Sequence, residues 1–455
     1  MKAQKRQKEE RLGTAPIGSL ILELAIPAIA AQLVNVLYNI VDRIYIGRIP
    51  EVGMVALTGL GVCFPIITLI SAFSAFVGAG GAPLAAIQMG KGNHEKAEKI
   101  LGNGALILLC FSIILTVFFM IFRRPILMAF GASEATIGYA MEYLDVYLIG
   151  TIFVQFALGL NTFISCQGKA LIAMLSVLIG AIINIVLDPI FIFVFDMGVK
   201  GAALATIISQ MFSAIWVVGY LLSKHSGLRL KAKNLVPDMR IVGAIAALGV
   251  SPFVMQATES LVVVTFNSGL KQFGGDLYVG SMTILSSVMQ IVVIPIQGLT
   301  QGTQPIISYN YGAKQFDRVK QAFKRVLIIC FSATTVCCLL TVFFPTVFAR
   351  LFTDEADAIA LVGKVLPIYM GGIWLFGVQM ACQSSFMAMG QAKISLFLAL
   401  LRKVILLVPL ALILPRVFNN VMGIYWAEPI ADIIAALTTG TMFLFTFKKI
   451  IAKAE

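Results

Sequence analysis

The stretch GGAPLAAIQMGKGNHEKAEK, residues 80–99, decides the fold of this chain because it returns in altered form as GTQPIISYNYGAKQFDRVKQ, residues 302–321. The two stretches align at an offset of 222 residues, and glycines and prolines elsewhere pair at nearly the same offset. The pairs are Gly80 with Gly302, Pro83 with Pro305, Gly90 with Gly312, Gly150 with Gly372, Gly168 with Gly390, Gly201 with Gly423 and, at 225, Pro27 with Pro252. An offset this constant predicts a duplicated unit.

The composition around this repeat is that of a membrane protein. Of the 455 residues, 59% are hydrophobic and 12% are charged, whereas a soluble domain has about 45–50% apolar and about 25% charged residues. Twelve apolar runs approach or exceed the length of about 20 residues that spans a bilayer. They lie near 17–46, 53–78, 97–122, 137–159, 169–195, 199–223, 240–270, 277–300, 319–347, 359–386, 392–415 and 421–447. The sequence predicts an all-α integral membrane protein with twelve transmembrane helices.

Each copy of the repeat contains six of these runs. An even number gives both copies the same orientation, so we expect two parallel six-helix repeats around a central cavity, an arrangement found in secondary transporters. The predicted domains are an N-terminal lobe over 1–222, a cytoplasmic linker over 223–240 and a C-terminal lobe over 241–455.

The Lys and Arg residues are concentrated in every second loop. With the N-terminus in the cytoplasm, 23 of the 34 Lys and Arg residues fall on the cytoplasmic side, 7 on the other side and 4 inside spans. This bias predicts that both termini are cytoplasmic. The net charge of +12 therefore reflects membrane topology, and no basic face with aromatics indicates nucleic-acid binding.

The sequence lacks the motifs that are typical of several enzyme classes. There is no G-x-x-x-x-G-K-[ST] motif to hold ATP and no G-x-S-x-G nucleophile motif. Both histidines lie in predicted loops, and the seven cysteines lie in apolar runs without a CxxC pair, which indicates buried thiols. We expect neither an enzyme nor a cofactor, so energy must come from an ion gradient, or transport is passive.

A polar stripe runs along the first predicted helix. Gln32, Asn35, Asn39 and Asp42 recur at spacings of three and four residues, with Tyr38 beside them. In lipid such a stripe must face protein or water, so it either lines a substrate pathway or holds neighbouring helices by hydrogen bonds. Two further residues of this helix are Pro27, which removes a backbone hydrogen bond and allows a hinge, and Arg43, which we interpret as an anchor that snorkels to the headgroups.

The fifth predicted helix carries a second costly acid. Asn184 and Asp188 share one helix face at a spacing of four residues. Asp42 and Asp188 together make a proton or cation site plausible, because hard oxygen ligands also suit Na⁺. Thr206 and Tyr143 are candidates for further oxygens, or for ordinary packing.

The second half does not repeat this pattern. Asn184 and Asp188 align with Leu406 and Leu410, so we infer that ion handling resides in the first half. The polar residues of the second half leave two roles open, a substrate site or structural ion pairs. They are Gln256, Glu259, Lys364, Arg402, Lys403, Glu428 and Asp432.

The segments IPAIAAQLVNVLYNIVDRIYIG (26–47), QGTQPIISYNYGAK (301–314) and NIVLDP (184–189), within twelve spans, resemble the multidrug and toxin extrusion (MATE) family, and its DinF/MepA-like branch in particular. The resemblance covers essentially the whole chain. It implies a proton or Na⁺ coupling site in the N-terminal lobe formed by Asp42, Asn184, Asp188, Thr206 and Tyr143, of which the first four would be the Na⁺ ligands. The NorM-type branch instead uses a span-seven Glu and a span-ten Asp, and span ten here contains no Asp.

The resemblance also implies a function. We expect efflux antiport of amphipathic, often cationic, compounds by a monomer in the bacterial cytoplasmic membrane, with the polar stripe, Gln256 and Glu259 along the substrate pathway. The expected partners are these compounds and membrane lipids. One alternative is a flippase of a lipid-linked saccharide, in which Lys364, Arg402 and Lys403 would line a cationic cavity. Another is a membrane enzyme or sensor that does not transport.

Overall fold

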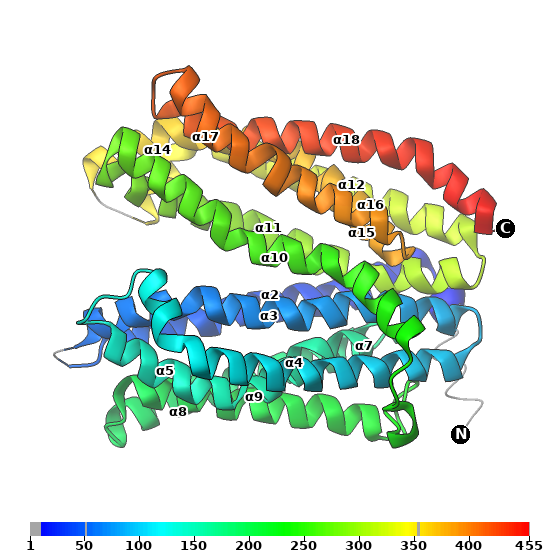
Figure 1. Cartoon of the computed structure of the whole chain (residues 1–455). Coiled ribbons are helices and arrows are strands. Elements are labelled where there is room, and N and C mark those ends of the chain that lie inside the picture. The colour runs from blue at the N-terminus through cyan, green and yellow to red at the C-terminus, as the bar shows by residue number, and fades with distance from the viewer. Residues whose placement is uncertain (1–10, 51, 353–354, 455) are drawn as a thin grey trace.

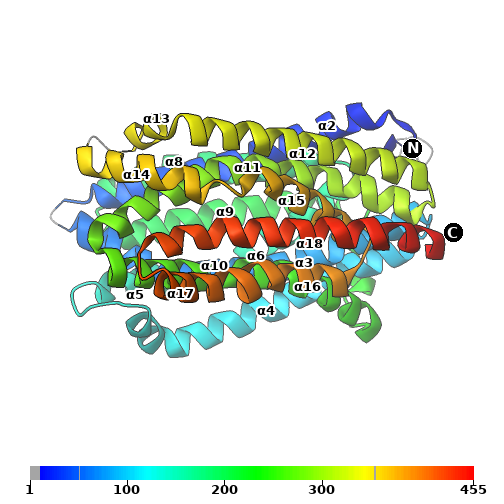
Figure 2. The same ribbon diagram turned by 90° about the horizontal axis from the view of Figure 1, so that it is seen from above.

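The computed structural model describes residues 11–50, 52–352 and 355–454, and within these ranges helices joined by turns and loops are the only regular secondary structure. Two bundles lie one above the other in Figure 1, and in Figure 2, where the molecule is seen from above, one bundle covers the other. The N lobe contains α2 (Ile17–Gly47), α3 (Gly53–Gly90), α4 (His94–Ala129), α5 (Ile137–Ile149), α6 (Thr151–Gly159), α7 (Asn161–Ser165), α8 (Ala170–Pro189), η1 (Ile190–Val194) and α9 (Gly198–Leu222). A short turn of helix, η2 (Ala232–Asn234), follows. The C lobe contains α10 (Met239–Gly274), α11 (Asp276–Gly312), α12 (Phe316–Phe343), α13 (Pro345–Arg350), α14 (Ala356–Tyr369), α15 (Ile373–Ala388), α16 (Ala392–Leu400), η3 (Leu401–Leu407), α17 (Val408–Val417) and α18 (Met422–Ala454).

The described helices provide twelve spans, six in each lobe. Ten helices are individually long and apolar enough to cross a membrane, and two bent pairs complete the set. The first pair bends by 60° between Ile149 and Thr151, and the second by 47° between Tyr369 and Ile373. Gly150 and Gly372 lie at these bends, where a Cβ atom would approach Ile207 to 2.2 Å and Pro429 to 2.7 Å. The repeat therefore places a glycine at the same bend in both lobes.

The helices that carry the repeated stretch are longer than predicted. The spans predicted to end near residues 78 and 300 continue as helix to Gly90 and Gly312, through Pro83 and Pro305. Proline removes one backbone hydrogen bond, but neighbouring helices inside a membrane bundle hold the helix on both sides of it. The repeated stretch is thus the end of a helix followed by a tight turn.

The two lobes meet at this same end of the molecule. A Cβ atom on Gly90 would lie 2.0 Å from the carbonyl oxygen of Tyr309, and one on Gly312 would lie 2.0 Å from that of Ile87. Both contacts join α3 of the N lobe to α11 of the C lobe. The ribbons of the lobes come together at the end that carries the C-terminus and diverge toward the opposite end (Figure 1).

The segment between the lobes packs against the N lobe. It covers residues 223–238, two residues fewer than the predicted linker, because α10 begins at Met239. Gln167 Oε1 accepts hydrogen bonds from the backbone N–H groups of Gly227 at 2.8 Å and Leu228 at 3.1 Å. Asn103 Oδ1 accepts one from the N–H of Asp238 at 2.8 Å. These bonds fix the position at which the second repeat begins.

Candidate ion site and central cavity

The polar stripe of α2 connects the lobe interface to the interior of the N lobe. Gln32 donates through Nε2 to Gln301 Oε1 of α11 at 2.9 Å. Asn35 lines both the cavity between the lobes and a smaller cavity of about 20 Å³ inside the N lobe, which Tyr38 also lines. Asn39 is exposed, and its Nδ2 returns to the backbone oxygen of Asn35 at 2.6 Å.

Asp42 and Asp188 meet where α2 packs against α8. Asp42 is 8% exposed and Asp188 is fully buried, and their carboxyl groups lie within hydrogen-bonding reach of each other. Two carboxylates can share a hydrogen bond only if one of them carries a proton. Within the described part of the chain neither acid forms an ion pair with a basic side chain.

Asn184 links this acid pair to α9. Its Nδ2 atom lies 3.2 Å from Asp188 Oδ1 and 3.5 Å from Thr206 Oγ1. Three buried oxygens of the group have no hydrogen-bond partner among the described residues, namely Asp42 Oδ1, Asn184 Oδ1 and Asp188 Oδ2. Hard oxygen donors without partners are what a bound proton or Na⁺ requires. The residues predicted as the coupling site are therefore brought together, in an arrangement that fits either ion.

Tyr143 completes the group from α5. Its hydroxyl lies near Thr206, and its ring stacks on that of Tyr147, with centroids 6.1 Å apart and planes 17° apart. The sequence favours Tyr143 for this position over Tyr147, which lies one helical turn further along. The sequence reasoning missed Gln210, which lines the same small cavity as Tyr38, although Gln210 follows Thr206 by one helical turn on the same face.

Arg43 forms no ion pair with Asp42, although its charge acts on that carboxyl group from a distance. Its guanidinium lies over the ring of Phe64, with Cζ 5.1 Å from the ring centroid, and the side chain is exposed. Adjacent residues on a helix point about 100° apart, so the two charges leave α2 in different directions. This geometry agrees with the anchor interpretation.

The cavity between the lobes is neutral. Its volume is about 400 Å³, and no charged side chain lines it among the described residues. The polar side chains that line it are mostly amides and hydroxyls, among them Gln32, Asn35, Asn161, Gln256, Gln301, Gln304 and Ser308. Asn161 Oδ1 has no hydrogen-bond partner among the described residues, and no pattern in the sequence marks this residue. Pro27 is buried and lines a separate hollow beside Gly168.

Glu259, predicted on the substrate pathway, lies outside the cavity lining. It forms an ion pair with Lys403, whose Nζ atom also donates to the backbone oxygen of Met255 at 2.9 Å. The side chain of Glu259 is 60% exposed. Lys364 is also exposed. Neither Lys364 nor Lys403 lines the cavity. Of the two roles that the sequence left open for Glu259, the structure therefore supports the ion pair, and the packing of two helices identifies Lys403 as the partner.

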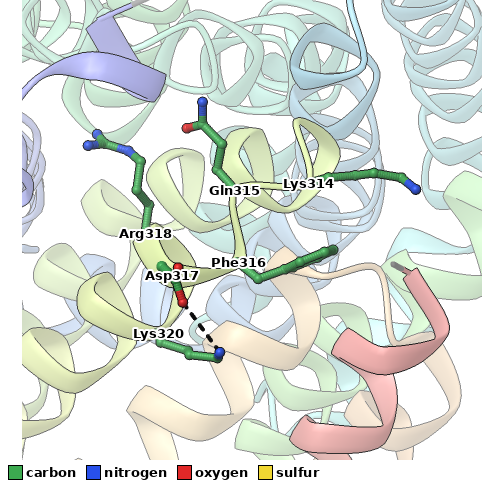
Figure 3. Close-up of a pocket in the computed structure, with 6 residues that line it drawn as sticks. All are labelled: Lys314, Gln315, Phe316, Asp317, Arg318 and Lys320. Atoms are coloured by element: carbon green, nitrogen blue, oxygen red, sulfur yellow. Dashed lines mark hydrogen bonds and ion pairs between the residues drawn. The ribbon is translucent and has the colours of Figure 1, made fainter.

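Another hollow lies on the surface, at the turn between α11 and α12. In contrast to those of the cavity between the lobes, most of its lining residues are charged. Its volume is about 590 Å³, and the residues that line it are Lys314, Gln315, Phe316, Asp317, Arg318 and Lys320 (Figure 3). Asp317 and Lys320 form an exposed ion pair at 3.4 Å. None of the residues predicted to bind an ion or a substrate lies in this hollow.

Two lobes of six spans with a cavity between them are the architecture of a membrane transporter. The MatE family model matches residues 27–190 and 252–413, one segment in each lobe. The chain belongs to this family, the MATE family, and its members are transporters rather than enzymes. It is an integral membrane protein.

Several known proteins are similar to this chain over almost its full length. The multidrug export protein MepA of Staphylococcus haemolyticus is 25% identical over 416 residues, which cover 91% of each chain. A crystal structure of MATE in the bent conformation superposes with a TM-score of 0.91 at 24% identity, covering 98% of this chain and 99% of the other. An outward-facing multidrug resistance MATE family transporter of the MOP superfamily gives a TM-score of 0.86 at 25% identity, covering 97% and 98%.

Proposed function

We propose that this transporter is a cation-coupled multidrug efflux antiporter. A proton or Na⁺ enters at Asp42 and Asp188 while an amphipathic, often cationic, compound leaves through the central cavity by alternating access. The observation that carries the proposal is the buried acid pair, which has three unpartnered oxygens around it and no basic partner within the described residues. Export by the similar MepA proteins supports the choice of substrate class.

Coupling follows from the charge of the site. A bound proton or Na⁺ removes negative charge between α2 and α8, and Asn184, Thr206 and Tyr143 hold the oxygens in place. If the ion binds the two arrangements of α2 with different affinity, it shifts the equilibrium between them. Pro27 is the proposed hinge, because the helix lacks one backbone hydrogen bond there.

The lining of the cavity suits an amphipathic compound. Gln32, Asn35 and Gln256 present amide groups among small apolar side chains, so a substrate finds oxygen acceptors without meeting a fixed charge. Tyr38 and Asn39 continue the stripe from the cavity toward the acid pair. We propose a monomer in the bacterial cytoplasmic membrane with both termini in the cytoplasm, as the distribution of Lys and Arg favours.

The alternative is a flippase of an anionic lipid-linked saccharide. That function calls for a basic cavity. Arg402 and Lys403 are instead engaged by acidic side chains, and the described cavity lining contains no charge. These observations favour the efflux antiporter.

The test is transport of a fluorescent cation into everted vesicles, the direction that corresponds to efflux from the cell, under separately imposed proton and Na⁺ gradients. We expect one of the two gradients to drive efflux in the wild type and neither to drive it in Asp42→Asn. Glu142→Gln is the matched control, because it removes an exposed carboxylate next to Tyr143 and should leave efflux unchanged. Full gradient-driven efflux by Asp42→Asn would refute the proposal.

A further inference from the structure

Arg402 binds two buried acids in the core of the C lobe. Its Nε atom donates to Asp432 Oδ1 at 2.7 Å, and its Nη2 atom donates to Glu428 Oε1 at 2.9 Å. Glu428 is 4% exposed and Asp432 is 1% exposed. The guanidinium also lies over the ring of Phe376, with Cζ 4.7 Å from the ring centroid. Since all three charges lie inside the bundle, their sum matters more than it would at a surface.

The position of this cluster is related to the N-lobe site by the repeat. At the offset of 222 residues, Glu428 aligns with Thr206 and Asp432 aligns with Gln210. Tyr369, which lies close to both acids, aligns with Tyr147. The acids of the C lobe therefore lie on the span equivalent to α9 instead of the span equivalent to α8. This shift explains why comparing Asn184 and Asp188 with Leu406 and Leu410 showed no second site.

The charges of the cluster do not balance. The basic groups are Arg402 and Lys403, and the acidic groups are Glu428, Asp432 and Glu259. Lys403 is engaged by Glu259 and by the backbone oxygen of Met255. One guanidinium thus faces two fully buried carboxylates, which leaves one negative charge in excess when every group is ionised. A buried charge without a counter-ion is costly, and a carboxylate avoids the cost by taking up a proton.

One atom of the cluster is free to take that proton. Asp432 Oδ2 is buried and has no hydrogen-bond partner among the described residues, whereas Oδ1 of the same carboxylate is occupied by Arg402. A metal ion needs several oxygen ligands and would lie beside the guanidinium, which repels it. A proton needs a single lone pair.

We infer that the C lobe contains a second proton-binding site, formed by Glu428 and Asp432 with Arg402 as a built-in counter-ion, at the position equivalent to the N-lobe site. The excess carboxylate binds one proton as a neutral carboxylic acid, and its deprotonation leaves the cluster with a net negative charge. Arg402 occupies the role that a mobile cation would have in the N lobe. The second site is separate from Asp42 and Asp188 and does not depend on their proposed function.

Infrared spectroscopy of the full-length protein tests this inference in a background without the N-lobe acids. In Asp42→Asn/Asp188→Asn at neutral pH, exposed acids are ionised, so the C=O stretch of a protonated carboxyl, with its shift in ²H₂O, reports buried protons. We expect one protonated carboxyl per molecule. Adding Glu428→Gln or Asp432→Asn should each abolish the signal, because either substitution removes the excess charge.

Glu98→Gln is the control, because Glu98 is a mostly buried acid that pairs with Lys231 away from the C-lobe core, and the signal should remain. Size-exclusion profiles show whether each variant folds, and having two independent substitutions keeps the test decisive if one does not. A background without a protonated carboxyl would overturn the inference. So would a signal that survives Glu428→Gln or Asp432→Asn.

Discussion

Arg318 of the C lobe donates a hydrogen bond from Nη2 to the backbone oxygen of Ala15, 2.6 Å away in the segment before α2. The same nitrogen lies 3.2 Å from the oxygen of Leu12, and Nε donates to Asn310 Oδ1 at 2.9 Å. Figure 3 shows the Arg318 side chain extending away from Lys320. The start of the N lobe is thereby fastened to the turn of the repeated stretch in the C lobe.

Arg318→Gln should weaken the closed arrangement at this end. Hydrogen bonds from a charged group are each worth about 1.5–3 kcal/mol, so the population with separated lobes should rise about tenfold or more. Spin labels at positions 91 and 324, on opposite lobes, would report a longer distance. Lys320→Gln, on the same helix, should not change it. An unchanged distance distribution in Arg318→Gln would show that the lobes are held by packing alone.

Gly90→Ala and Gly312→Ala should each push the lobes apart. The new Cβ atom would lie 2.0 Å from a backbone oxygen, which cannot rotate away as a side chain does. Overpacking of this kind costs about 1–3 kcal/mol, so we expect lower thermal stability and slower efflux. Gly219→Ala is the matched control, since nothing lies within 4 Å of its Cβ position. Wild-type stability of both variants would contradict this account of the interface.

Thr206→Val should weaken ion binding more than it weakens folding. The substitution keeps the size of the side chain and removes the hydroxyl that Asn184 and Tyr143 contact. A neutral hydrogen bond contributes about 1 kcal/mol, so the ion concentration for half-maximal efflux should rise roughly fivefold. Tyr143→Phe should give a change of similar size. If both variants respond to the ion gradient as the wild type does, neither hydroxyl belongs to the site.

Arg402→Met should destabilise the protein strongly, because it leaves Glu428 and Asp432 buried without a counter-ion. Losing one partner of a buried ion pair costs about 3–5 kcal/mol, which thermal unfolding in detergent would register. The triple variant Arg402→Met/Glu428→Gln/Asp432→Asn should recover most of the stability, because no charge is then left unpaired. Failure of that rescue would indicate that Arg402 acts through packing on Phe376 instead.

Arg43→Leu should have little effect on efflux. Its guanidinium lies on Phe64, and an exposed contact of this type is worth about 0.5–1 kcal/mol. We expect nearly normal efflux with the same ion dependence. A marked shift in the ion concentration required would mean that Arg43 holds Asp42 in its ionised form.

The sequence predicted those features that depend on local periodicity. Three such features can be found in the sequence without a structure: the apolar runs, the repeat offset and the spacing of Asn184 and Asp188. From them we predicted the twelve spans and the acid pair. Helix ends were less predictable, because Pro83 and Pro305 end a helix in water but not inside a packed bundle. The sequence indicated structural ion pairs among the charged residues of the second half, and Arg402 does pair with Glu428 and Asp432. That Lys403 pairs with Glu259 depends on which long side chains meet across helices, which no spacing rule encodes.

The bonds of residues 223–238 to the N lobe have a mechanical consequence. Gln167 and Asn103 bind this segment between Gly227 and Asp238, so the chain between the lobes is held against the N lobe and is not a flexible linker. Asp238 caps α10 through its side chain, which accepts from the N–H of Arg240 at 3.0 Å. The first turns of α10 continue this attachment, because Ile241 and Ile245 lie in the N-lobe core and Gly249 lies against the backbone of Phe76 in α3. Rotation of one lobe against the other must therefore be taken up beyond this part of α10, so the covalent connection bends within a helix and not within the loop.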